Sequence, residues 1–272
     1  MGKRLLRAHV WLVYAFLYAP ILVVVVLAFN KGKQVLLWEG FSLKWFGEAL
    51  NDPTITDPLK NSLLIAGGNA ICACVLGTML ALALPKMRPW LRIPIDALAY
   101  MTLVTPEIVF GISALIFFVQ VGSWIGLTNP LGIWTVLVSH VVFNASVVAL
   151  VVRARFVGMR QNLEEASFDL GAGPIATFRQ VTFPQLAPAV LAGGLLAFTF
   201  SFDDFVTSFF VAGAGTTTLP LRIFASLRFG VSPAINAVAA MILAFTLTAV
   251  VVAYTILRRT GGGRTGTVVP GV

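Results

Sequence analysis

Six long apolar runs constrain the fold of this sequence more than any other feature. They cover roughly His9–Phe29, Asn61–Leu84, Pro94–Val121, Leu131–Val152, Gln185–Ala212 and Pro233–Leu257. Each is long enough to cross the ~30 Å hydrocarbon core of a bilayer, which takes about 20 helical residues. Of the 272 residues, 58% are hydrophobic and 11% are charged, a balance typical of integral membrane proteins. We therefore predict an all-α, polytopic membrane protein with six transmembrane helices.

The basic residues indicate how these helices are oriented. Six of the nineteen lysines and arginines flank one set of helix ends, namely Lys31, Lys33, Lys44, Lys60, Arg222 and Arg228, and the rest flank the opposite ends. The richer side is expected to be cytoplasmic, which places both termini there. The net charge of +8 is thereby explained by membrane topology, and no nucleic-acid partner is expected.

The runs and their flanks divide the chain into three predicted regions. Residues 1–60 hold the first transmembrane helix and an extracytoplasmic segment, residues 61–257 form the transmembrane core, and residues 258–272 form a flexible basic cytoplasmic tail. The first run lacks a small-residue cleavage site and is too long for the apolar part of a removed signal peptide. It is therefore expected to remain as an anchor.

A polar stretch on the predicted cytoplasmic side, EEASFDLGAGPIATFRQVTFP from Glu164 to Pro184, interrupts the apolar C-terminal half. It predicts two short helices joined by a turn. Gly171 and Gly173 stand where a helix ends, and Pro174 suits the first position of the next helix, where a missing N–H costs little. A compact helical projection between two membrane spans is suited to docking with something outside the membrane.

The spacing within this stretch resembles a known family signature. Glu165-Ala166-Ser167, three residues, Gly171, nine residues and then Val-Thr-Phe-Pro184 is similar to the EAA motif, E-A-A-x3-G-x9-I-x-L-P. That motif marks the membrane subunits of type I ABC importers. The resemblance implies the type I ABC importer transmembrane fold, with residues 160–184 as a coupling loop against a cytoplasmic ATPase. It assigns that coupling to Glu165, Ala166, Ser167, Asp169, Gly171 and Pro184.

Acidic residues also occur inside the apolar runs, where a charge costs roughly 2.5–3.5 kcal/mol on insertion scales. The fifth run carries Asp203 and Asp204. Placed at 100° steps around one helix, these two share a polar face with Thr199 and Thr207, opposite a phenylalanine-rich face. Such a face is suited to line a substrate pathway. The alternative is a set of hydrogen bonds between helices with no substrate contact.

The third run contains Glu107, next to Pro106. Proline can leave carbonyls of the preceding turn unpaired, so Glu107 either lines the same pathway or braces a broken helix.

Asp96, near Arg92, is expected at the membrane interface. His140, inside the fourth run, is expected to be packed or hydrogen-bonded between helices rather than to be a ligand.

Around these residues the resemblance becomes more specific. The segments LVTPEIVFGISALIFF and FTFSFDDFVTSFFVAGAGTTTLPLRIFASLRFGVSPAINAVA are similar to the spermidine/putrescine-type branch of the importer family. The resemblance implies a prokaryotic inner-membrane location and four kinds of partner: membrane lipid, a second permease subunit, an ABC ATPase dimer and an extracytoplasmic solute-binding protein. An acid-lined helix face also suits a polyamine cation on chemical grounds.

Catalytic chemistry is not expected in this chain. The sequence has neither a Walker A pattern nor a cluster with metal-ligand spacing, so ATP and Mg²⁺ would be bound by the partner ATPase. One alternative is the same machinery for another solute, such as ferric iron, an amino acid derivative or another organic cation. A second is an ion-coupled secondary transporter using Asp203 and Asp204, although such proteins need no EAA motif and many carry inverted repeats that are not evident here.

Overall fold

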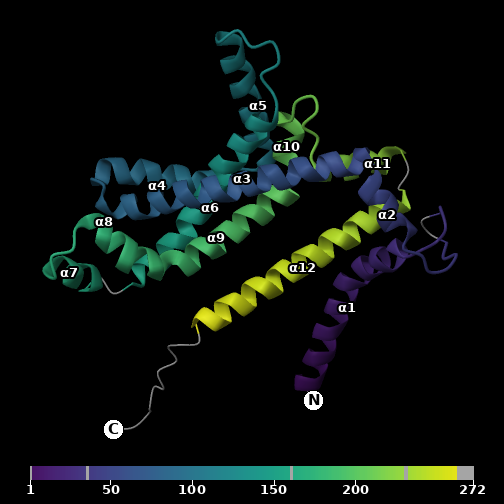
Figure 1. The fold of residues 1–272 in the computed structure, drawn as a ribbon, viewed down its shortest axis with the longest axis horizontal. Coiled ribbons are helices and arrows are strands. Elements are labelled where there is room, and N and C mark those ends of the chain that lie inside the picture. Colours follow the sequence, from purple (N-terminus) through teal and green to yellow (C-terminus); the bar gives the residue numbers. More distant parts are fainter. Residues whose placement is uncertain (1, 35–36, 160–161, 230–231, 262–272) are drawn as a thin grey trace. The chain divides into compact units, whose positions relative to one another are not determined.

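The computed structural model describes residues 2–34, 37–159, 162–229 and 232–261. Within these ranges the regular structure is helical, apart from one isolated antiparallel bridge between Asn30 and Phe41. The elements, labelled in Figure 1, are α1 (Gly2–Ala28), α2 (Lys44–Asn51), α3 (Pro53–Ala83), η1 (Leu84–Lys86), α4 (Pro89–Val104), α5 (Glu107–Trp124), α6 (Ile133–Val157), α7 (Asn162–Asp169), α8 (Pro174–Thr177), η2 (Phe178–Thr182), α9 (Phe183–Asp203), α10 (Val206–Val211), α11 (Leu219–Phe229) and α12 (Pro233–Gly261). The all-α prediction is confirmed.

Five of these helical segments are long and apolar enough to cross a membrane, namely Gly2–Ala28, Pro53–Lys86, Glu107–Trp124, Ile133–Val157 and Pro174–Asp203. The sixth predicted span corresponds to α12, in which Pro233–Thr248 is a shorter apolar segment. This helix continues past Leu257 to Gly261, because nothing in its sequence ends it earlier. The rest of the predicted tail, residues 262–272, lies outside the described residues.

The chain divides into two compact units. The first comprises Met1–Thr56 and Ile223–Val272, and in it both α1 and α2 pack against α12. Large apolar side chains along α1 remain exposed, among them Trp11 and Phe16 at 73% and 77%. A helix that exposes such side chains along its whole length requires lipid or another subunit around it.

The second unit, Asp57–Arg222, is built around α6. Helices α3 and α9 pack on α6 through a core of small and branched side chains, namely Ala73, Ala81, Val148, Val152, Leu186 and Ala197. Gly77 of α3 permits this close approach, since a Cβ atom there would stand 2.7 Å from both the Ala145 carbonyl oxygen and Val148 Cβ. Small residues at helix contacts are the usual means of close packing in membranes.

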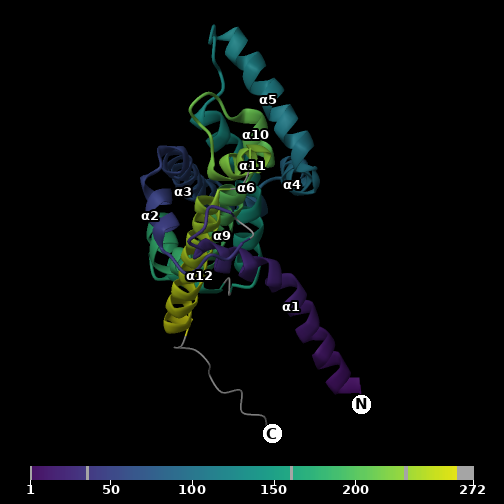
Figure 2. The same ribbon diagram turned by 90° about the vertical axis from the view of Figure 1, so that its right-hand side faces the viewer.

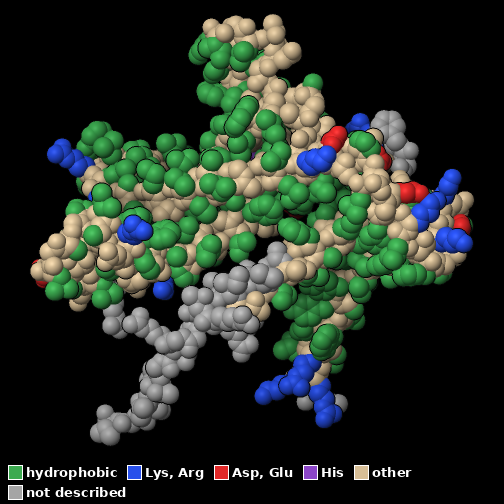
Figure 3. All heavy atoms as spheres, in the orientation of Figure 1, with side chains coloured by type: hydrophobic (Ala, Val, Ile, Leu, Met, Phe, Trp, Pro, Cys, Tyr) green, Lys and Arg blue, Asp and Glu red, His purple; other side chains and the backbone are tan. Residues whose placement is uncertain are grey.

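The third apolar run is not the continuous span that the sequence predicted. It forms two helices, α4 and α5, which meet at a bend (Figure 2). Thr105 is extended, with φ −63° and ψ 129°, because the residue before a proline avoids the helical region and Pro106 has no N–H to donate. Helix α5 then begins at Glu107. Hydrophobic side chains are spread along both helices (Figure 3).

An ion pair joins α4 to α6. Arg153 donates from Nη1 to Asp96 Oδ1, and the two side chains are 20% and 22% exposed. The sequence placed Asp96 beside Arg92, its neighbour in the chain. The structure instead pairs it with a residue fifty-seven positions away, so this acid connects two helices.

Candidate functional site

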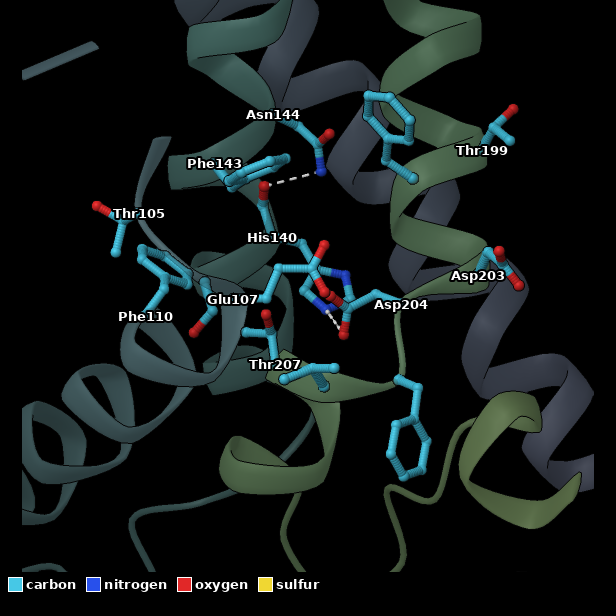
Figure 4. A pocket seen from close by; sticks show the side chains of 14 residues that line it. Thr105, Glu107, Phe110, His140, Phe143, Asn144, Thr199, Asp203, Asp204 and Thr207 are labelled. Carbon is cyan, nitrogen blue, oxygen red and sulfur yellow. Dashed lines mark hydrogen bonds and ion pairs between the residues drawn. The ribbon is translucent and has the colours of Figure 1, made fainter. Parts of the chain in front are cut away.

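A cavity of about 450 Å³ lies beside the middle of α6. Figure 4 shows the fourteen side chains that line it, which come from the α4–α5 bend, α6, the end of α9 and the segment after it. Three of them are carboxylates, and none of these lining residues is a lysine or arginine. Phenylalanine rings and hydroxyl groups make up much of the remaining surface. The cavity therefore combines negative charge with aromatic walls, a combination that suits an organic cation.

All five residues that the sequence proposed for a substrate pathway line this cavity, namely Glu107, Thr199, Asp203, Asp204 and Thr207. Glu107 enters from the first turn of α5, because the break at Pro106 ends α4 just before it. Glu107, Thr199 and Asp203 are exposed, whereas Thr207 is buried. The fold thus brings together acids from the third and fifth apolar runs.

The fifth run, like the third, is broken, and the prediction of one continuous helix over Gln185–Ala212 is wrong. Helix α9 ends at Asp203, and Asp204 is extended with φ −64° and ψ 120°. A second helix, α10, begins at Val206. The 100° spacing used to place Thr207 on the face of Asp203 therefore does not apply across this break. Both residues nevertheless reach the cavity.

The two adjacent aspartates have different surroundings. Asp204 Oδ1 accepts the backbone N–H of Ser208 at 2.8 Å and lies 3.3 Å from His140 Nε2. Its side chain is 15% exposed. Asp203 is exposed, and Figure 4 shows its carboxylate turned away from His140. Hydrophobic patterning alone does not distinguish these two neighbours.

His140 is 3% exposed and has polar partners at both ring nitrogens. Nδ1 lies 2.7 Å from Ser201 Oγ, and Nε2 lies 3.2 Å from Ser208 Oγ as well as close to Asp204. Its carbonyl oxygen accepts a hydrogen bond from Asn144. The prediction of a packed, hydrogen-bonded histidine is confirmed, and it joins α6 to both helices of the broken run.

A second candidate site is the polar projection between α6 and α9. Helix α7 ends in a turn in which Gly171 has φ +82° and donates its N–H to the Phe168 carbonyl oxygen at 2.8 Å, while Ala172 donates to that of Ser167 at 3.0 Å. The predicted turn at Gly171 is therefore confirmed, and Pro174 opens α8 as predicted. A π-helical turn, η2, then leads into α9.

Two side-chain contacts hold this projection together. Ser167 Oγ lies 3.0 Å from Thr177 Oγ1, and Thr182 donates its hydroxyl to Glu164 Oε1 at 2.6 Å. Of the six residues assigned to coupling, Ser167 is thus turned inward. The others are exposed, namely Glu165, Ala166, Asp169, Gly171 and Pro184.

The projection also exposes large apolar side chains that sequence reasoning did not single out. Leu170 is 89% exposed and Ile175 is 84% exposed, and Leu163, Phe168 and Phe178 are each more than 40% exposed. An apolar group of this kind beside exposed acids is a candidate contact surface.

Known proteins resemble this chain in sequence and in fold. The family model described as "Binding-protein-dependent transport system inner membrane component" matches residues 73–260. The putrescine transport system permease protein PotI of Escherichia coli strain K12 is 40% identical over 233 residues, covering 85% of this chain and 82% of PotI. The spermidine/putrescine transport system permease protein PotC of Haemophilus influenzae is 35% identical over 260 residues, covering 95% and 99%.

Solved structures agree with the fold. A chain of a bacterial ABC transporter involved in the import of the acidic polysaccharide alginate has a TM-score of 0.69 at 16% identity, with 95% of each chain covered. The alginate transporter in complex with a pentasaccharide-bound periplasmic protein gives a TM-score of 0.71 at 17% identity, covering 95% of this chain and 94% of the other. With most of its length matched by the family model and by these relatives, this multi-pass chain belongs to the family of binding-protein-dependent transport system inner membrane components.

Proposed function

We propose that this chain is one of two membrane subunits of an ATP-driven importer for polyamines such as putrescine and spermidine. The observation that carries the substrate class is the acid-lined cavity, where Glu107, Asp203 and Asp204 meet aromatic walls without a lysine or arginine among the lining residues. A flexible chain carrying several ammonium groups and methylene segments complements such a surface. The names of PotI and PotC support the same substrate class.

The other components of the importer are inferred from the family. A second, similar membrane subunit would complete the pathway, and an extracytoplasmic binding protein would deliver the solute. Two cytoplasmic ATPases would bind ATP and Mg²⁺, since this sequence carries no Walker A pattern. Both termini would lie in the cytoplasm, as the distribution of basic residues indicates.

The exposed face of α7 and α8 would transmit ATPase closure to the spans. Leu170 and Ile175 would enter an apolar groove on the ATPase, with Glu165 and Asp169 at its polar edge. Movement of α8 would pass directly into α9, because η2 joins these two helices without an intervening loop. The cavity would then alternate between the two sides of the membrane.

Uptake by a reconstituted complex tests the substrate class. Proteoliposomes that contain this chain, its partner permease and the ATPase, with the binding protein outside, should accumulate labelled putrescine or spermidine only when ATP is inside. Unlabelled polyamine should compete, whereas ferric iron, a neutral amino acid and an acidic sugar should not. ATP-dependent accumulation of one of these other solutes in place of a polyamine would reassign the substrate while keeping the importer.

A further inference from the structure

The break between α9 and α10 gives two adjacent carboxylates different surroundings. A continuous helix would place Asp203 and Asp204 one step apart on the same polar face. In the structure Asp203 closes α9, whereas Asp204 lies in the extended link before α10. The difference therefore arises from the backbone.

The partners of Asp204 are all within the chain. Its Oδ1 accepts the Ser208 N–H in the first turn of α10 and faces His140 Nε2. A carboxylate only accepts hydrogen bonds, so we assign the imidazole hydrogen to Nε2, which lies 3.3 Å from Asp204 Oδ1 and 3.2 Å from Ser208 Oγ. Asp203, by contrast, is exposed and turned away from this histidine (Figure 4).

The other imidazole nitrogen, Nδ1, contacts the hydroxyl of Ser201. The usual acceptor for a helical serine hydroxyl is the carbonyl oxygen four residues earlier, here that of Ala197. Asn69 of α3 donates to that oxygen at 2.8 Å, whereas Ser201 Oγ lies 2.7 Å from His140 Nδ1. With the imidazole hydrogen on Nε2, the Ser201 hydroxyl is the donor to Nδ1. Both ring nitrogens of His140 thus have a polar partner, one on each side of the helix break.

We propose that His140 is a positioning residue that holds Asp204 as part of the helix break. Asp204 then fixes the start of α10 and does not serve as a mobile ligand. Asp203 and Glu107 are left as the two carboxylates that bind ammonium groups of the solute. The inference rests on the proposed function, and it separates two residues that the sequence treats alike.

A double-mutant cycle on uptake tests whether Asp204 has a structural role while Asp203 binds solute. Uptake rates are measured per assembled complex. His140→Ala and Asp204→Ala should each lower uptake of labelled putrescine about tenfold, and the double variant should be no slower than either one, because each single change removes the contact between Asp204 Oδ1 and His140 Nε2. His140→Ala combined with Asp203→Asn should lower uptake about a hundredfold, the product of two independent effects. His140→Gln should stay within about threefold of the wild type, since its amide still donates to Asp204.

Three results would overturn the positioning role: normal uptake by assembled His140→Ala, independent effects of His140→Ala and Asp204→Ala, or a Gln variant as slow as the Ala variant. The same cycle measured on the melting temperature of the purified complex needs no solute, and it should also show coupling of His140 to Asp204 but not to Asp203. If His140→Ala does not assemble, Ser201→Ala takes its place in both cycles, with the same coupling pattern expected. A wild-type complex that transports no polyamine would contradict the proposed function alone, because the melting cycle decides the role of His140 separately.

Discussion

At the scale of single residues, backbone conformation explains why one position in the projection between α6 and α9 accepts glycine best. Gly171 has φ +82°, although a Cβ there would meet nothing within 4 Å. The cost of a side chain is therefore backbone strain, of order 1–2 kcal/mol for an L-residue and more for a β-branched one. The strain would act on the turn that orients α7 against α8.

Gly171→Val should lower transport at least tenfold while the subunit still inserts and assembles, because the turn that presents α7 is distorted. Gly173 provides the matched control, since it has φ −74° and also has open space around it. Gly173→Ala should leave uptake within about twofold. Uptake and ATP hydrolysis measured on the same proteoliposomes distinguish uncoupling from loss of protein. Equal effects of the two substitutions would show that backbone strain at Gly171 is not the cause.

Particular residues show which structural features could be predicted from the sequence and which could not. The apolar runs predicted the helices because hydrophobic length is a local property. Pro106 signalled a break in the third run. The break after Asp203 had no comparable local signal, since Asp204 is stabilised outside a helix by His140, which lies on α6. In the same way, nothing near Asp96 indicated its pairing with Arg153. Contacts between distant positions decide both cases, and hydrophobic patterning does not report them.

At the scale of elements, the approach of α3 to α6 depends on a missing side chain. Gly77→Ala would place Cβ 2.7 Å from the Ala145 carbonyl oxygen, so the helices must separate at a cost of about 1–3 kcal/mol. Gly67, on the same helix, has open space, and Gly67→Ala should be neutral or slightly stabilising. The melting temperature of the purified subunit should fall for the first variant only. A fall of equal size in both would point to helix flexibility instead of packing.

The ion pair between α4 and α6 should contribute more than an exposed one. Arg153→Gln leaves Asp96 unpaired in a largely buried position, and we expect a loss of roughly 1–3 kcal/mol. Lys60→Gln breaks the pair with Asp57, whose side chains are 70% and 64% exposed, and should have no measurable effect. The exchanged pair, Asp96→Arg with Arg153→Asp, should recover part of the loss in melting temperature. If the melting temperature neither falls in Arg153→Gln nor recovers in the exchanged pair, this ion pair does not stabilise the subunit.

At the scale of the whole molecule, the orientation in the membrane rests on the basic residues. With Cys72 and Cys74 replaced by alanine, a cysteine in place of Gly2 should be shielded from an impermeant thiol reagent in intact cells. One in place of the exposed Asn129 should react. Asn129 is a better probe than Gly40, whose φ of +118° disfavours a side chain. Labelling at position 2 but not at 129 would place α7 and α8 outside the cell and defeat the coupling scheme.

The central claim is that the acids of the cavity lie on the path of a polyamine, and uptake by the doubly substituted complex tests it most directly. Replacing Asp203 by asparagine and Glu107 by glutamine keeps their size and removes the two charges that face the solute. Loss of one close charge partner in a partly hydrated cavity is worth roughly 1–4 kcal/mol. Fully assembled complex that carries both substitutions should therefore take up labelled putrescine at least tenfold more slowly than the wild type. Normal uptake by that complex would contradict the account.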